Sequence, residues 1–154
     1  MANNASNYLE EKILQHLFNN NSSHSAFTAP ADNAIFISLH STAGPLDDNS
    51  GTNTEVPFNG ATGTDYDYTR GGGTVSDLTW TVAESGGTVT AKNNEAIVFP
   101  QASNNYPAQI THIGIYDAAT GGTLLFPGQL TVAKTVTQGD TFQINANALV
   151  ITLE

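Results

Sequence analysis

The spacing of hydrophobic positions near the start of the chain predicts one short amphipathic helix. Between residues 8 and 18, apolar side chains recur at spacings of one, three and four, which places them on one helical face. This apolar stripe consists of Leu9, Ile13, Leu14, Leu17 and Phe18. Asn7, with Glu10 three residues later, predicts the N-cap. A helix of about three turns is marginal alone, so its stripe must pack on the chain's own β-domain or on a neighbouring subunit.

Several later segments of the chain carry apolar residues at alternate positions, in the manner of strands. "NAIFISLH" (33–40) predicts a buried strand, and "TVSDLTWTVAE" (74–84) predicts one with Leu78, Trp80 and Val82 facing inward. Ile97 and Phe99 are expected to face inward from a later strand. Two final strands are expected around 141–144 and 149–153. Turn signals recur about every eight to twelve residues, so the fold class is mainly β, an antiparallel β-sandwich (jelly-roll-like) with one N-terminal amphipathic helix.

The predicted organisation is an N-terminal helical arm (1–21) and a single β-sandwich domain (22–154). The domain contains a long loop excursion over residues 41–74, which is rich in Gly, Asn, Asp, Thr and Pro. Short strands are expected within it at 54–58 and around 66–70. Loops of this length inside a compact domain are usually functional or become ordered by a partner.

The segment "THIGIYDAATGGTLLFPGQL" (111–130) predicts a hairpin of two core strands. Asp117 can bond to the backbone of its own turn, and glycines such as Gly121 and Gly122 can adopt positive φ. Pro127 and Gly128 are expected to break the second strand. The glycine runs "RGGGT" (70–74) and "TGGT" (120–123) lack the following helix and the lysine of a phosphate-binding loop, so both are predicted to be turns.

Composition narrows the possible functions. The 154 residues suffice for one domain with a core, and the absence of cysteine excludes disulfides. Fourteen acidic against four basic residues give a formal charge of -10, which disfavours nucleic acid as a partner. No signal peptide is visible, and no apolar run approaches the roughly 18 residues that span a bilayer. We therefore expect no membrane partner and a soluble product assembled in the cytoplasm.

Catalytic and metal-binding patterns are weak. His16, His24, His40 and His112 lie outside any nucleophile motif, and the chain contains no G-x-S-x-G. The acidic stretch 45–55 offers oxygen donors suited to calcium, yet its spacing is not that of an EF-hand because Phe58 occupies the twelfth position. The sequence predicts no enzyme, no cofactor and no metal.

Several segments, taken in order, resemble a family of small tailed-bacteriophage virion structural proteins. They are "YLEEKILQHLF" (8–18), "IFISLHSTAGPLDDNSGTNTEV" (35–56), "YTR" (68–70), "NNEAIVFP" (93–100) and the C-terminal segment 110–154, which begins "ITHIGIYDAATGGTLLFPG". The recurring marks of that family are the helix, the strand end near "SLH" and the hairpin. The sequence departs from the family in "STAGPLDD" and "TDYDYTR", both within the excursion.

The resemblance implies a non-enzymatic virion component. We expect a capsid decoration (cement) protein that bridges subunits of the major capsid protein, as a homo-oligomer with a trimer favoured. The alternative is a tail or tail-fibre-associated module for host recognition through carbohydrate, with Tyr66, Tyr68 and Tyr106 as stacking faces. The residues expected to contact partners are Tyr8, Leu9, Ile13, His16, Leu17, Asp47, Asp48, Asn53, Tyr66, Tyr68 and Arg70.

Overall fold

The computed structural model describes residues 5–18, 34–41, 55–57, 64, 66–74 and 79–153. Within these residues the chain forms one helix, α1 (Asn7–Phe18), and a set of strands. The strands are β1 (Ala34–His40), β2 (Gly71–Thr74), β3 (Trp80–Ser85), β4 (Thr88–Asn93), β5 (Ile97–Gln101), β6 (Ile110–Tyr116), β7 (Leu124–Lys134), β8 (Thr141–Ile144) and β9 (Val150–Leu153). Among the described helical residues, no stretch is long and apolar enough to cross a membrane.

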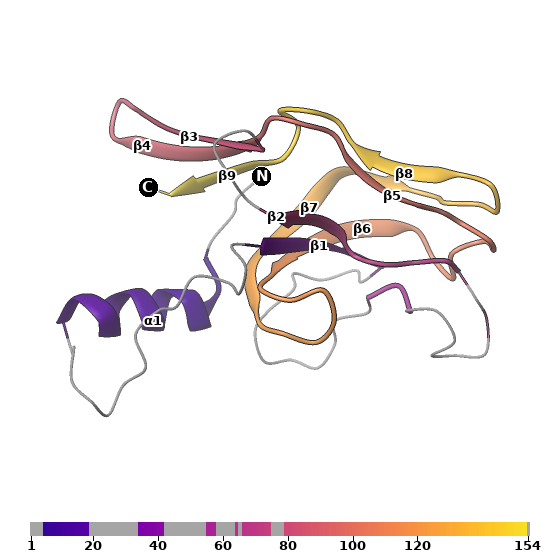
Figure 1. Ribbon diagram of the computed structural model, residues 1–154, viewed down its shortest axis with the longest axis horizontal. Coiled ribbons are helices and arrows are strands. Elements are labelled where there is room, and N and C mark those ends of the chain that lie inside the picture. The colour runs from indigo at the N-terminus through magenta and orange to yellow at the C-terminus, as the bar shows by residue number, and fades with distance from the viewer. Residues whose placement is uncertain are drawn as a thin grey trace.

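The strands form two layers, as Figure 1 shows. One layer is a four-stranded sheet in the order β2-β1-β6-β7. The other consists of a three-stranded sheet, β3-β4-β9, and a two-stranded sheet, β5-β8. Every strand pair is antiparallel. The prediction of a mainly β, antiparallel fold with one N-terminal helix is confirmed.

The core lies between the two layers and is built from alternate residues of the strands. Ile37 and Leu39 of β1 are fully buried, and Phe99 of β5 is 2% exposed, as their strand patterns predict. Ile113 and Ile115 of β6 join them in one cluster. Because β1 and β6 occupy the centre of the four-stranded sheet, their inward side chains are covered on all sides.

The prediction that Val82 of β3 faces the core is wrong. Val82 is 70% exposed, although it shares a sheet face with the half-buried Trp80. β3 is an edge strand of its sheet, and the β3–β4 hairpin extends beyond the four-stranded layer (Figure 1). The far end of this face therefore lies beyond the described strands that cover the core. Leu78, predicted to point inward with them, lies outside the described residues.

The β6–β7 hairpin forms as predicted. The Asp117 carboxylate accepts a hydrogen bond from the Thr123 amide at 2.6 Å, and Gly121 and Gly122 have φ of 60° and 72°. The predicted break at Pro127 and Gly128 is wrong, because β7 runs through both residues with register shifts in its pairing. β7 is an edge strand, where the missing N–H of proline can face away from the sheet.

The excursion 41–74 differs from its prediction in two places. "RGGGT" is not a turn, because Gly71–Thr74 forms β2 and pairs with β1. A Cβ on Gly71 would lie 2.7 Å from Cγ2 of Ile97, so the glycine allows the two layers to approach closely at this point. Residues 66–70 form no strand, and of the span 54–58 only 55–57 are described, with Glu55 in an isolated bridge to His40.

The N-cap of α1 is Ser6 rather than the predicted Asn7. The Ser6 hydroxyl accepts from the Leu9 amide at 3.2 Å, and its carbonyl accepts from the Glu10 amide. The Ser6 amide in turn donates to the Leu125 carbonyl of β7 at 2.8 Å. This contact joins the start of the helix to the sheet, while the rest of α1 extends away from it (Figure 1).

Candidate functional site

The apolar stripe of α1 is largely uncovered. Leu9 near the start of the helix is buried at 5% exposure, but exposure rises along the helix to 83% at Phe18. Ile13, Leu14 and Leu17 between them are exposed, and so is Tyr8 just before Leu9. The helix therefore packs on its own chain at its first turn and presents its remaining apolar surface to the outside.

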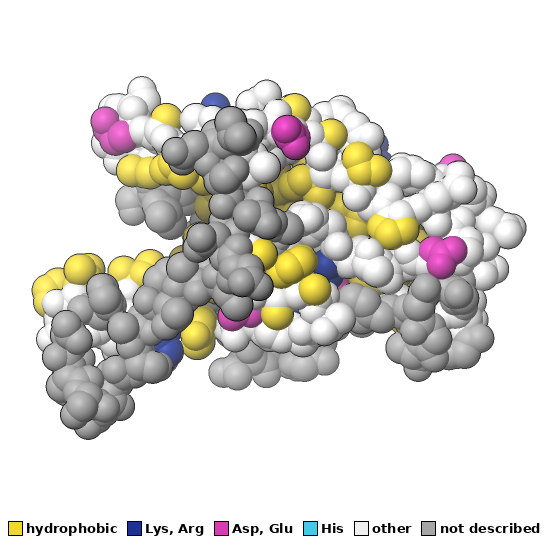
Figure 2. Space-filling view, in the orientation of Figure 1, with side chains coloured by type: hydrophobic (Ala, Val, Ile, Leu, Met, Phe, Trp, Pro, Cys, Tyr) yellow, Lys and Arg dark blue, Asp and Glu magenta, His cyan; other side chains and the backbone are white. Residues whose placement is uncertain are grey.

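A second uncovered apolar face lies on the β3–β4 hairpin. Val82 pairs with Ala91 of β4, which pairs with Ile151 of β9, so these three side chains share one face. Ile151 lies in the core, whereas Val82 and its neighbour on that face, Val89, are 70% and 37% exposed. Figure 2 shows hydrophobic side chains along the side of the β3–β4 hairpin that faces α1, and along the side of α1 that faces the hairpin.

We call these two faces together the apolar surface, defined by Tyr8, Ile13, Leu14, Leu17, Phe18, Val82 and Val89. Their fractional exposures correspond to on the order of 600 Å² of accessible side-chain surface. Contiguous apolar patches on monomeric proteins rarely exceed a few hundred Å², and larger ones mark interaction sites. α1 contributes five of the seven residues and most of this area, so its face by itself is of the size that marks an interaction site. A typical stable interface buries about 800 Å² per partner, so a contact of one such face would need additional surface around it.

A separate polar cluster lies beneath the β6–β7 loop and is mostly shielded from solvent. Arg70 forms a two-pronged pair with Glu55: Nη2 to Oε2 at 2.7 Å and Nε to Oε1 at 2.8 Å. Its Nη1 donates to the carbonyls of Ala118 and Gly121 at 2.7 and 2.8 Å. The guanidinium also stacks over the Tyr116 ring at 3.7 Å. Arg70 thus joins the excursion to the hairpin loop.

The cluster continues through Tyr68 into β1. The Tyr68 hydroxyl donates to Glu55 Oε1 at 2.9 Å and accepts from the Leu39 amide at 3.0 Å. Burial, followed by the charge of Glu55, raises the pKa of Tyr68, so the hydroxyl stays protonated. Burial opposes the charge of Arg70, but its hydrogen bonds to Glu55 and the charge of Glu55 outweigh burial and raise its pKa.

His40 lies at the edge of this cluster and is fully buried. The Ser38 hydroxyl donates to the Gly114 carbonyl at 3.1 Å, so His40 Nε2 must donate to Ser38 Oγ at 2.7 Å. His40 Nδ1 has no hydrogen-bond partner among the described residues. Burial lowers the pKa of His40 to about 4, and the nearby positive charge of Arg70 contributes to this shift.

The polar cluster therefore fixes segments of the fold and offers no open reacting group. The Arg70 side chain is 3% exposed and that of Glu55 is 16% exposed. Their hydrogen-bonding capacity faces other parts of the same chain rather than a cleft. Its neutral histidine, protonated tyrosine and paired carboxylate supply fixed contacts, as expected of a structural brace.

The structure separates the predicted partner-contact residues into accessible and inaccessible groups. Tyr8, Ile13 and Leu17 are exposed on α1, whereas Leu9 is covered. Arg70 and Tyr68 are held in the polar cluster, which corrects their prediction as contact residues. Asp47, Asp48 and Asn53 lie outside the described residues, and so does the side chain of His16.

The prediction that tyrosines provide stacking faces for carbohydrate is wrong. Tyr66, Tyr68 and Tyr106 are 9%, 0% and 7% exposed, and they pack against one another as part of the core. The prediction failed because tyrosines in a sequence without visible strand periodicity look like loop residues. The exposure of Val82 and Val89 was not predicted from the sequence, because strand alternation does not indicate where a sheet extends beyond the layer that covers it.

Comparison with known families gives one match that covers most of the chain. The model of the family described as "Podophage GP4 fiber I protein gp80" matches residues 4–152. A comparison with curated proteins finds no match.

Proposed function

The chain belongs to the podophage GP4 fiber I protein gp80 family, a family of phage virion structural proteins, and we propose that it is a fiber-associated structural protein that assembles through its apolar surface. The family description favours the fiber alternative over the capsid cement role expected from the sequence. A structural role in the virion is consistent with the closed polar cluster. Carbohydrate stacking by the three core tyrosines has no place in this proposal.

The single observation that carries the assembly role is the uncovered apolar face of α1. Among the described residues, the 12-residue helix is held to the sheet near its first turn. A helix of this length is marginally stable alone, so its exposed stripe needs a partner. The β3–β4 hairpin of a second copy offers an apolar face of matching character. We propose homo-oligomers in which α1 of one copy packs against the β3–β4 face of the next, with closed symmetry and a trimer favoured.

Charge makes a distinctive prediction for this assembly. Each copy carries a formal charge of -10, so copies repel one another at long range. The seven side chains that define the apolar surface are uncharged, and Glu84, which pairs with Val89, adds one negative charge to the β3–β4 face. Added salt screens the repulsion and leaves the apolar contact intact. Oligomerisation should therefore strengthen as salt rises from about 0.05 to 0.5 M, opposite to the behaviour of an interface built on ion pairs.

The test is sedimentation velocity of the whole chain over a range of protein concentrations, with Leu17→Ser as the variant. Leu17 is 65% exposed, and losing its burial in an interface should weaken association by about tenfold or more. Val132→Ser is the matched control, because Val132 is equally exposed but lies on β7 outside the apolar surface. A wild-type chain that stays monomeric throughout, or equal behaviour of the two variants, would contradict assembly through α1.

A further inference from the structure

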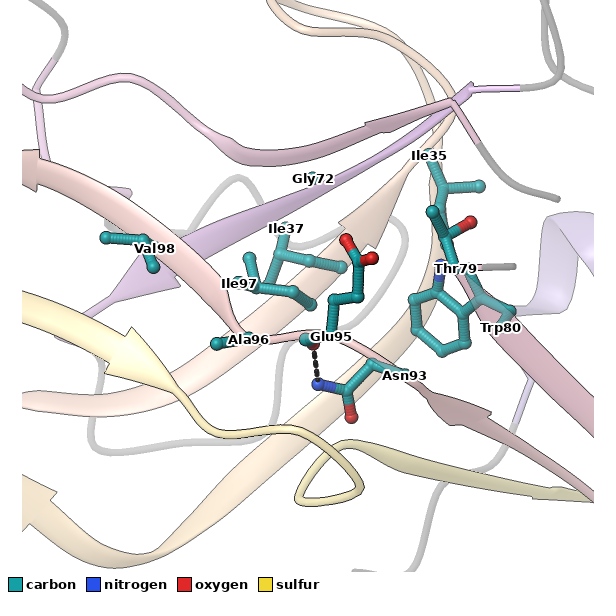
Figure 3. Close-up of a pocket in the computed structure, with 10 residues that line it drawn as sticks. All are labelled: Ile35, Ile37, Gly72, Thr79, Trp80, Asn93, Glu95, Ala96, Ile97 and Val98. Atoms are coloured by element: carbon teal, nitrogen blue, oxygen red, sulfur yellow. Dashed lines mark hydrogen bonds between the residues drawn. The ribbon is translucent and has the colours of Figure 1, made fainter. Parts of the chain in front are cut away.

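A cavity of about 340 Å³ opens between the two layers. Ile35 of β1 and Gly72 of β2 line one side, and Trp80 of β3 and Ile97 of β5 line the other. Figure 3 shows the Glu95 side chain extending into this space next to the indole of Trp80. The volume lies within the range of about 300 to 1,000 Å³ that is typical of small-molecule sites.

A hydrogen bond to its backbone holds Glu95 in place, so its carboxylate is available to contact a ligand in the cavity. It lies in the bend between β4 and β5, where Asn93 Nδ2 donates to its carbonyl at 2.8 Å. The Asn93 side chain also donates to the Asn145 carbonyl and accepts from the Leu149 amide, both at 2.9 Å. Asn93 is 1% exposed, so it anchors this bend rigidly. Among the described residues, no hydrogen bond or ion pair engages the Glu95 carboxylate.

The groups around the cavity favour a positively charged ligand. The face of tryptophan attracts cations more strongly than any other aromatic ring, and a carboxylate beside it adds a direct charge. The described lining contains no lysine or arginine that would neutralise Glu95. The isoleucine walls suit an aliphatic stem. A neutral sugar would need several free polar side chains, but the Asn93 amide is already occupied by backbone groups.

We propose that this cavity binds an organic cation, an alkylammonium or guanidinium group carried on an aliphatic stem, with Glu95 and Trp80 as its recognition residues. The charged head lies between the Glu95 carboxylate and the indole face, and the stem lies against the isoleucines. The source is a free amine or a lysine or arginine side chain of another protein. The site does not depend on the fiber assignment, so its failure would leave the assembly proposal unaffected.

The chain contains one tryptophan, so its fluorescence reports directly on the cavity. The protein is titrated with n-butylammonium chloride, with n-butanol and with D-glucose, at ionic strength held constant with NaCl. We expect a saturable change with n-butylammonium whose midpoint is at least about tenfold lower than any seen with n-butanol. The lysine amide Ac-Lys-NH2 forms a further arm: tighter binding than n-butylammonium assigns the source to a protein side chain, and equal or weaker binding assigns it to a free amine.

Glu95→Gln should weaken n-butylammonium binding about five- to tenfold while leaving the far-UV circular dichroism spectrum unchanged. Glu10→Gln on α1 is the matched control, since it removes the same charge far from the cavity. The proposal is overturned if n-butylammonium causes no saturable change, if n-butanol binds equally well, or if Glu95→Gln binds like the wild type. Saturable binding of D-glucose that survives Glu95→Gln would identify a saccharide site instead.

Discussion

Removal of the Arg70 guanidinium should destabilise the fold more than any comparable loss of surface charge. In Arg70→Met, the Glu55 carboxylate loses both of its charge-assisted hydrogen bonds from Arg70, and the carbonyls of Ala118 and Gly121 lose their shared donor. Because the Glu55 side chain is only 16% exposed, water replaces these bonds poorly.

The magnitude follows from the burial of the pair. Breaking a buried ion pair by removing one partner costs about 3 to 5 kcal/mol, because the other charge is left uncompensated. In a chain of 154 residues, this loss corresponds to a fall in Tm on the order of 10 °C. Arg70→Lys keeps the charge but cannot span both Glu55 oxygens and the loop carbonyls, so it should cost about 2 kcal/mol.

Urea unfolding monitored by Trp80 fluorescence, at one fixed protein concentration, measures these free energies of unfolding. Lys92→Met is the matched control, since Lys92 is exposed on β4 and its loss should change stability by less than about 0.5 kcal/mol. The double variant Glu55→Gln/Arg70→Met should cost less than the sum of its single changes. If Arg70→Met cost less than about 1 kcal/mol, or no more than Lys92→Met, the polar cluster would not stabilise the fold as inferred from its contacts.

Three further perturbations test separate parts of the structure. Burial lowers the pKa of His40 to about 4 in the folded chain, against 6.5 for the ordinary side chain, so between these values the unfolded chain binds the proton more strongly. The free energy of unfolding of the wild type should therefore fall by about 3 kcal/mol as pH falls from 6.5 to 4, and this contribution should not change above pH 6.5. Urea unfolding of His40→Gln should show a smaller loss over the same pH range. Gly114→Ala places a Cβ 2.8 Å from Ser38 Oγ and should lower stability by about 1 to 3 kcal/mol in the same assay. Ser6→Ala removes the N-cap and should destabilise α1 by about 1 kcal/mol, seen as faster amide hydrogen exchange over residues 7–10.

Each of these three predictions would be contradicted by a specific result. Equal pH dependence of the wild type and His40→Gln would mean that His40 is not the group that titrates. Wild-type stability of Gly114→Ala would show that β1 and β6 can separate to admit a methyl group. Unchanged exchange in Ser6→Ala would place the determinant of the helix start elsewhere.

The strands and turns with strong local signals were predictable. Ile37 and Leu39 occupy alternate positions of one strand and Phe99 lies two residues from Ile97 in another, and all three are buried as expected. Asp117 with its glycines forms the predicted hairpin loop. Local chemistry decides such features, because side-chain periodicity fixes which residues share a face and turn residues fix where the chain reverses. The apolar stripe of α1 was equally visible in the sequence.

The candidate sites were less predictable, because they depend on which strands become neighbours. The pairing of Glu55 with Arg70 and their contact with the loop after β6 join segments that are far apart in the sequence. The cavity likewise needs Trp80 and Glu95 to meet residues of β1 and β2 across the two layers. The spacing of residues along the sequence does not indicate which distant segments come into contact.

The sequence by itself determined that this protein is a mainly β chain with one amphipathic helix and a phage virion resemblance, because these depend on local periodicity and on motifs. Only the tertiary structure decided that the tyrosines of the excursion are core residues, that "RGGGT" is a strand and that β3–β4 extends beyond the core. Burial is a property of the whole packed assembly of strands, so a residue such as Val82 can alternate perfectly and still face solvent.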